Sequence, residues 1–422
     1  ADLDRKIARK IEAFGVKWWK ARPKNRFQSW DVAKKRELLE EAATIEIPEG
    51  SWLAVRDLLW KSLKKNGPKG KGRDKVFLDT PYPQKMWSYV TSTRGKNKGL
   101  VVGLHGGGEG AGSAEGPRGT WQFKGCVGVY PQGLVLQGDN WNTVQGEKQI
   151  LSMMEIVKAQ YDIDPDRVYV AGFSMGGTGS WHMAGRFPDL FAGAAPCAGV
   201  IMARPKSQIE KKEDVLALQY GLLPNVRNLA VYSFIGLADK NCMPGTFLFA
   251  WDEIQDLKAD DPEGYGKIRF QSYPGLAHAF PPGEPGKCIA WLLEQKRDTF
   301  PQKIVWQYAR DPFPLPKQFD RTKRLIQRWF YWIHHTDPTD RMEVVAERTG
   351  NTIKLETSGE LTGMSILLNP EMIDVTKDVV VLVDDEEVYR GKPKPSFPML
   401  VRSLSARLDK RQFYDRSIAL AD

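Results

Sequence analysis

The sequence has no apolar run of eighteen or more residues, so we expect no membrane-spanning segment. It contains only four cysteines and no C-x-x-C pair, which disfavours a structural zinc site. It also lacks internal repeats, zinc-finger spacing and the aromatic signature of RNA-binding domains, so we expect no nucleic-acid partner. What remains is a globular composition, with 41% apolar and 27% charged residues, 14 Trp and 39 Gly, which is enough for a large core.

The positive charge is confined to one end of the chain. Residues 1–75 hold 20 Lys and Arg against 11 Asp and Glu, a net charge of +9, which equals the net charge of the whole chain. The favoured interpretation is a solvated helical face, with anionic lipid or an acidic polysaccharide as alternatives. The start Ala-Asp-Leu-Asp, without Met, is typical of a processed chain, although a trimmed one would look the same. We therefore expect a secreted or periplasmic protein.

The pattern of apolar residues predicts three regions. Residues 1–75 are expected to form a helical segment (Arg5–Lys20, Trp30–Ala43 and Ser51–Leu63, the last with a capping serine) that ends in a Gly/Pro/Lys linker. Residues 76–300 alternate short apolar runs with helical patterns, which predicts an α/β core: a mostly parallel sheet with helices on both faces. The strands expected there are Leu100–Leu104, Val127–Tyr130, Val168–Ala171, Leu229–Ile235 and Ile268–Tyr273, and the clearest crossover helix is Glu147–Tyr161.

Residues 301–422 change to a strand pattern without dominant helical periodicity. They are expected to form a small antiparallel β-sandwich-like domain, with strands at Ile304–Tyr308, Leu325–Ile333, Thr352–Thr357, Met364–Leu368 and Val379–Val383. Binding or packing is the leading role expected for this region.

The strongest local motif is Gly172-x-Ser174-x-Gly176, which directly follows a predicted strand and precedes a predicted helix. This is the pattern of a nucleophile elbow, in which a sharp turn exposes a strained serine and the flanking glycines avoid steric collision. We therefore predict that Ser174 is a catalytic nucleophile.

A serine hydroxyl needs a base and an acid that orients the base, and behind such an elbow both follow the serine in the chain. Of five histidines, only His278 follows a late strand of the predicted sheet. Asp239 directly follows the preceding strand, whereas its rivals Asp252 and Asp256 fall in a helical pattern. The predicted triad is Ser174, Asp239 and His278.

Acyl transfer also requires hydrogen-bond donors for the oxyanion. The run His105-Gly106-Gly107-Gly108 follows the strand Leu100–Leu104 and supplies such a loop. Gly107 is the favoured donor, Gly106 is next, and the Met175 amide at the helix start is the second donor. We expect structural roles for His105 and His182. His334 and His335 are disfavoured as metal ligands because neighbours on a strand point to opposite faces.

The cysteines leave two readings open. Cys242 and Cys288 follow the predicted acid and base loops and could form a disulfide, but buried free thiols, together with Cys126 and Cys197, are equally consistent with the sequence.

Four segments of the chain resemble the polyhydroxybutyrate-depolymerase and feruloyl-esterase-like branch of the α/β-hydrolases. They are Leu-His-Gly-Gly-Gly, the run Tyr161-Asp-Ile-Asp-Pro-Asp-Arg-Val-Tyr-Val, Gly-Phe-Ser-Met-Gly-Gly, and Phe187-Pro-Asp-Leu-Phe-Ala-Gly-Ala-Ala-Pro. The resemblance covers roughly residues 76–300. It implies a carboxylic ester hydrolase without metal or organic cofactor, acting on polysaccharide-linked esters (feruloyl or acetyl) or on polyesters. Residues 200–228 leave room only for a small cap, so an open site is expected.

Four aromatic residues lie close in sequence to the predicted site: Trp141, Phe173, Trp181 and Phe280. They are candidates for contact with an aromatic acyl group, although packing in the core is the commoner fate of such side chains. Two other functions are considered: a serine peptidase of the prolyl-oligopeptidase kind, and a catalytically silent surface-binding protein. The sequence does not determine the oligomeric state.

Overall fold

An eight-stranded sheet forms the centre of the protein in the computed structural model, which describes residues 3–82, 85–96, 98–107, 112–133, 141–200, 223–242, 244–309 and 325–421. Its strand order is β1-β2-β4-β3-β5-β6-β7-β8. The strands are β1 (Lys75–Phe77), β2 (Trp87–Thr91), β3 (Lys98–Leu104), β4 (Cys126–Gln132), β5 (Ile163–Phe173), β6 (Gly193–Cys197), β7 (Ala230–Gly236) and β8 (Ile268–Tyr273). The β1–β2 and β2–β4 pairs are antiparallel. All the other neighbouring pairs, from β4–β3 to β7–β8, are parallel. The predicted α/β core is confirmed.

Helices cover both faces of this sheet because side chains along each strand alternate between the faces. On β3, Leu100 and Val102 belong to one apolar cluster and Val101 to another. The first cluster includes side chains of α5 (Val144–Gln160), α6 (Met175–Arg186) and α8 (Pro244–Asp260). The second includes residues of α9 (Glu284–Leu293) and residues beside α4 (Glu115–Thr120). Both faces are therefore dry, which explains why the strands are apolar throughout.

Residues 301–421 contribute two further sheets that share one apolar core. One has the order β10-β11-β14-β17 and the other β16-β15-β13-β12-β9. Their strands are β9 (Lys303–Gln307), β10 (Trp329–Phe330), β11 (Ile333–His335), β12 (Glu343–Thr349), β13 (Thr352–Thr357), β14 (Met364–Leu368), β15 (Val379–Val383), β16 (Glu386–Gly391) and β17 (Arg416–Ala419). The expectation of a purely antiparallel region is wrong in one place, since β13 and β15 pair parallel.

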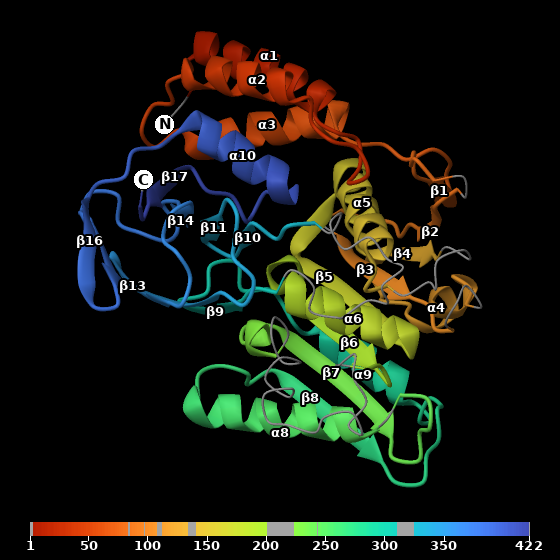
Figure 1. Ribbon diagram of the computed structural model, residues 1–422. Helices are drawn as coiled ribbons and strands as arrows, with labels where there is room; N and C mark the ends of the chain where they lie inside the picture. The colour runs from red at the N-terminus through yellow and green to blue at the C-terminus, as the bar shows by residue number, and fades with distance from the viewer. Residues whose placement is uncertain are drawn as a thin grey trace.

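The amino-terminal helices are α1 (Arg5–Ala21), α2 (Val32–Ala43) and α3 (Trp52–Asn66), close to the predicted ranges. Ser51 precedes α3, but its hydroxyl donates to the Pro48 carbonyl and makes no capping bond to the helix. A fourth helix, α10 (Phe397–Arg407), was not predicted, and it shares an apolar core with these three. Figure 1 shows the four helices together at one end of the molecule, with α8 at the other end.

The domain boundaries expected near residues 75 and 300 stay a prediction. The apolar core of α1–α3 also includes side chains from beyond residue 300, so these helices pack with the C-terminal region. Most of the predicted cap, residues 201–222, lies outside the described residues. No helix in the described ranges is long and apolar enough to cross a membrane.

Candidate active site

The turn from β5 into α6 carries the predicted nucleophile. Ser174 has φ 60° and ψ −125°, a conformation that is strained for a residue with a side chain. A β-carbon on Gly172 would lie 2.2 Å from the Gly176 carbonyl oxygen, and one on Gly176 would lie 2.2 Å from the Leu104 carbonyl oxygen. Only glycine fits at both positions, so the motif is explained by the sharpness of this turn.

The glycine loop after β3 lies against this serine. A β-carbon on Gly106 would lie 3.3 Å from the Ser174 β-carbon. Gly107, the favoured oxyanion donor, is exposed with φ 79°, and Met175 is the first residue of α6. Gly108 lies outside the described residues. Gly106 therefore lies against the serine, Gly107 follows it in the loop, and Met175 follows the serine in the chain.

The predicted acid and base form a hydrogen-bonded pair. His278 Nδ1 lies 2.7 Å from Asp239 Oδ2, although the two residues come from loops after different strands, β8 and β7. The second carboxylate oxygen of Asp239 accepts the backbone N–H groups of Asn241 at 2.8 Å and Cys242 at 3.0 Å. The Asp239 side chain is fully buried, whereas the His278 side chain is 19% exposed. This arrangement fixes the imidazole and leaves its Nε2 available as a proton acceptor.

Cys242 is a site residue that sequence reasoning treated only as a disulfide candidate. Its sulfur, the Asp239 carboxylate and a His278 ring nitrogen lie within 4.8 Å of one another, the only such group of metal-ligand types in the described part of the chain. Burial and the Asp239 charge raise the pKa of Cys242 to about 11, against a smaller lowering by a hydrogen bond with Ser174. The thiol is therefore protonated at neutral pH and is a poor nucleophile and metal ligand.

All four cysteines are buried and free, so the Cys242–Cys288 disulfide is not formed and the alternative reading, free thiols, describes the structure. Cys288 instead lies beside Cys197, which raises the pKa of the Cys197 thiol further after burial itself.

The four aromatic candidates separate into two groups. Phe173 and Phe280 lie at the site: their ring centroids are 4.2 Å apart, and Phe173 is 4.8 Å from the His278 ring. Trp141 and Trp181 are each only 1% exposed and pack in the core, so neither is accessible to a substrate. The closeness of Trp141 and Trp181 to the predicted site in sequence therefore did not predict whether their side chains are accessible.

A hollow of about 290 Å³ lies beside the nucleophile turn. It is lined by Leu104, His105, Gly106, Ser113, Gly116, Pro117, Thr120, Trp121, Phe173 and Phe280. Trp121, which the sequence did not single out, packs edge-on against Phe280 at 6.2 Å. The hollow offers an apolar, aromatic wall next to the predicted oxyanion loop.

Three of the four remaining histidines, His105, His182 and His334, have structural surroundings. His105 Nε2 accepts the Gly133 N–H at 3.0 Å and its Nδ1 lies 2.9 Å from the Gly106 carbonyl oxygen, while burial lowers its pKa. His182 is buried against Glu147, with 2.9 Å between Nε2 and the carboxylate. Burial, followed by Arg402 and Arg328, lowers the pKa of His334 to about 3. These contacts place all three rings in the packing of the protein.

Known proteins match the part of the chain that carries the candidate active site. Residues 139–277 match the family described as "Putative esterase". The match includes Ser174 and Asp239 and ends one residue before His278. The resemblance is confirmed.

Curated relatives match over similar lengths. A poly(3-hydroxyalkanoate) depolymerase C of Paucimonas lemoignei is 36% identical over 140 residues, 29% of this chain and 33% of the relative. A bifunctional acetylxylan esterase/xylanase of Neocallimastix patriciarum is 32% identical over 26% of this chain and 17% of its own. A feruloyl esterase B of Neurospora crassa is 28% identical over 28% of this chain and 45% of its own. The chain thus spans less than half the length of these relatives.

Proposed function

We propose that the protein is a serine carboxylic ester hydrolase with Ser174 as nucleophile, His278 as general base and Asp239 as the residue that orients the histidine. The observation that carries the proposal is the strained backbone of Ser174 between β5 and α6. Such strain persists only where the surrounding structure enforces it, and here it presents a hydroxyl beside a glycine loop. The His278–Asp239 bond and the match to an esterase family support the same reading.

The proposed reaction has two steps. His278 removes the Ser174 proton as the hydroxyl attacks the ester carbonyl, and the amides of Gly107 and Met175, with Gly106 as the alternative donor, stabilise the oxyanion. Collapse expels the alcohol, which takes the proton from the imidazolium. Water then attacks the acyl-enzyme through the same histidine and releases the acid. No metal or organic cofactor takes part in the proposed steps.

The hollow beside Ser174 supports a substrate class. Its walls include Trp121, Phe173 and Phe280, so we propose that it holds the acyl part of a polysaccharide-linked ester or of a polyester. Among such acyl groups, an aromatic one such as feruloyl uses these walls best. Secretion also remains part of the proposal.

The test of the reaction class is a substrate panel: a short p-nitrophenyl ester, methyl ferulate, acetylated xylan, an aliphatic polyester and a peptide amide. Wild type is expected to hydrolyse at least one ester, and Ser174→Ala to lose about 10⁴-fold or more of the turnover while its melting temperature is retained. Ester turnover by Ser174→Ala would refute the nucleophile. Cleavage of the peptide amide alone would support the alternative of a serine peptidase. Turnover of none of these substrates would support the alternative of a catalytically silent binding protein.

The acyl assignment is tested separately with Phe280→Ala. Phe280 is 38% exposed, so its loss should leave the fold intact while it removes an aromatic wall of the hollow. We expect kcat/KM for methyl ferulate to fall about tenfold relative to methyl acetate. Val388→Ala, a similarly exposed residue on β16, is the control. Equal losses for both esters would contradict an acyl role for the hollow.

A further inference from the structure

Two connected cavities lie at the end of the parallel strands opposite Ser174. Their walls include the last turns of α5 and the loop after α6, segments that lead into the amino ends of β5 and β6. One cavity has a volume of about 190 Å³ and the other about 250 Å³. They share Arg26, Ile326, Arg328, Trp329 and Ala406, so α1–α3, the sheet region and the C-terminal region all contribute to one space.

The walls of this space carry an excess of positive charge. The basic residues are Arg22, Arg26, Lys35, Lys158, Arg328, Arg402 and Arg407, and among the described residues of the lining the only acid is Glu155. Glu155 forms ion pairs with both Arg22 and Arg26, and Arg407 pairs with Asp189. Within the described ranges, Lys35, Lys158, Arg328 and Arg402 have no ion-pair partner. In the described part of the chain, the acids therefore balance only part of this charge.

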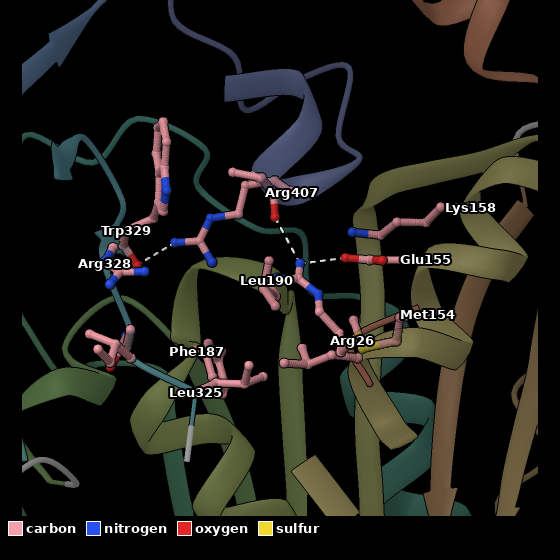
Figure 2. Close-up of a pocket in the computed structure, with 14 residues that line it drawn as sticks. Arg26, Met154, Glu155, Lys158, Phe187, Leu190, Leu325, Arg328, Trp329 and Arg407 are labelled. Atoms are coloured by element: carbon pink, nitrogen blue, oxygen red, sulfur yellow. Dashed lines mark hydrogen bonds and ion pairs between the residues drawn. The ribbon is translucent and has the colours of Figure 1, made fainter. Parts of the chain in front are cut away.

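Lys158 shows the imbalance most directly. The residue is 3% exposed, lines the first cavity beside Glu155 as Figure 2 shows, and its amine makes no hydrogen bond to any described group. Burying an ammonium costs free energy, and nearby carboxylates offset that cost only in part. Burial lowers its pKa to about 8, with Arg297 and Arg407 adding to the lowering against Asp409 and Glu155. The pKa of Lys158 thus stays below its usual value although Asp409 and Glu155 act on it.

Aromatic faces accompany these charges. The half-buried side chains of Trp30 and Trp329 line the second cavity together with Arg328 and Arg402. The second cavity alone, at about 250 Å³, is below the roughly 300–1,000 Å³ of pockets for drug-sized ligands, which favours a single ring over a nucleotide there. Guanidinium groups match the geometry of a carboxylate, and a flat indole suits the face of a sugar ring.

We propose that this space binds a carboxylate-bearing sugar, a uronic acid unit. The carboxylate pairs with the Arg328 and Arg402 guanidinium groups of the second cavity, and the ring packs on Trp30 and Trp329. The site is at the opposite end of the strands from Ser174, so the inference does not rest on the proposed ester hydrolysis. Such a site would hold the protein on an acidic polysaccharide while the Ser174 end stays free.

The experiment measures binding of D-glucuronate to the 422-residue chain by calorimetry and by tryptophan fluorescence. The comparison ligands are glucose, glucose 6-phosphate and inorganic phosphate. The variants are Arg402→Gln and Arg328→Gln, two exposed arginines without ion pairs, and the control is the exposed Lys394→Gln on the loop before α10. Each arginine variant is expected to weaken glucuronate binding about tenfold or more, because a charge-assisted bond is lost, and Lys394→Gln to leave it unchanged. Melting temperatures confirm that each variant is folded.

Glucuronate binding that weakens with added salt, is absent for glucose and is lost in both arginine variants supports the proposal. Equal binding of glucose, or tighter binding of glucose 6-phosphate or phosphate, overturns the assignment to a sugar carboxylate. Absence of glucuronate binding, or equal binding by both arginine variants and the control, overturns the site itself.

Discussion

The two ends of the parallel strands use charge in opposite ways. At the carboxyl ends, the described residues of the candidate active site include one buried carboxylate, Asp239, which is bonded to His278 and two backbone amides. At the amino ends, Arg297 pairs with Asp166 at 2.9 Å and with Asp409 at 2.7 Å. The first arrangement orients one side chain for chemistry, and the second joins segments far apart in the sequence. Substitutions at the two ends should therefore damage different properties.

The largest expected effect is on catalysis at the carboxyl ends. Asp239→Asn should lower kcat by about 10⁴-fold, because the amide no longer holds the histidine tautomer that accepts the Ser174 proton. The melting temperature should change little by comparison. The rate of ester hydrolysis per enzyme molecule gives kcat, and a thermal melt gives the melting temperature. Asp256→Asn, an exposed acid on α8, is the matched control, and a similar loss of kcat in that variant would argue against Asp239 as the triad acid.

The next effect is on stability at the amino ends. Asp409→Asn leaves the buried Arg297 and Lys158 with less compensation, and breaking such a pair costs about 3–5 kcal/mol. Urea denaturation should show this loss, while turnover per folded molecule stays near wild type. The control is Asp385→Asn, whose partner Lys354 is exposed. If both variants unfold at the same urea concentration, the buried network does not stabilise the junction.

A smaller effect is the pH dependence of stability at the same end. Hydrogen bonds from Arg227 and then Lys303 lower the pKa of Asp261 from 3.8 to about 2. Because the folded pKa is below the unfolded one, the group stabilises the protein above about pH 4, and this contribution is lost as the pH falls towards 2. Discounted for partial solvent contact, the contribution is about 1–2 kcal/mol.

Denaturation midpoints between pH 2 and 6 measure the contribution of Asp261 to the free energy of unfolding. Asp261→Asn should be less stable than wild type at pH 6 and nearly equal to it at pH 2, whereas the exposed neighbour Asp260→Asn should follow wild type throughout. A constant difference between Asp261→Asn and wild type across this range would contradict a titrating ion pair.

The sequence predicted those elements whose structure depends on residues close to one another in the chain. The turn at Ser174 depends on glycines two residues away on either side, and the apolar runs of β3, β5 and β7 signal strands by themselves. β6 was missed because Gly193-Ala-Ala-Pro-Cys197 has no β-branched or aromatic residue, and only its neighbours β5 and β7 hold it in the sheet.

The unpredicted parts depend on contacts between distant segments. The Arg297–Asp409 pair joins a residue before β9 to one between α10 and β17, so no spacing in the sequence indicates it. Cys242 lies close to Asp239 in sequence, but its approach to His278 depends on the separate loop after β8. Trp181 is turned into the core although it lies near the motif in sequence.

The core that α10 shares with α1–α3 has a consequence for biosynthesis. A ribosome makes the three amino-terminal helices several hundred residues before α10 emerges from its exit tunnel. During that interval Phe14, which is buried in the finished protein, lacks Phe397 of α10, whose ring packs against it at 5.2 Å. The nascent chain therefore carries an uncovered apolar face through most of translation, which makes it a substrate for chaperones that bind such faces.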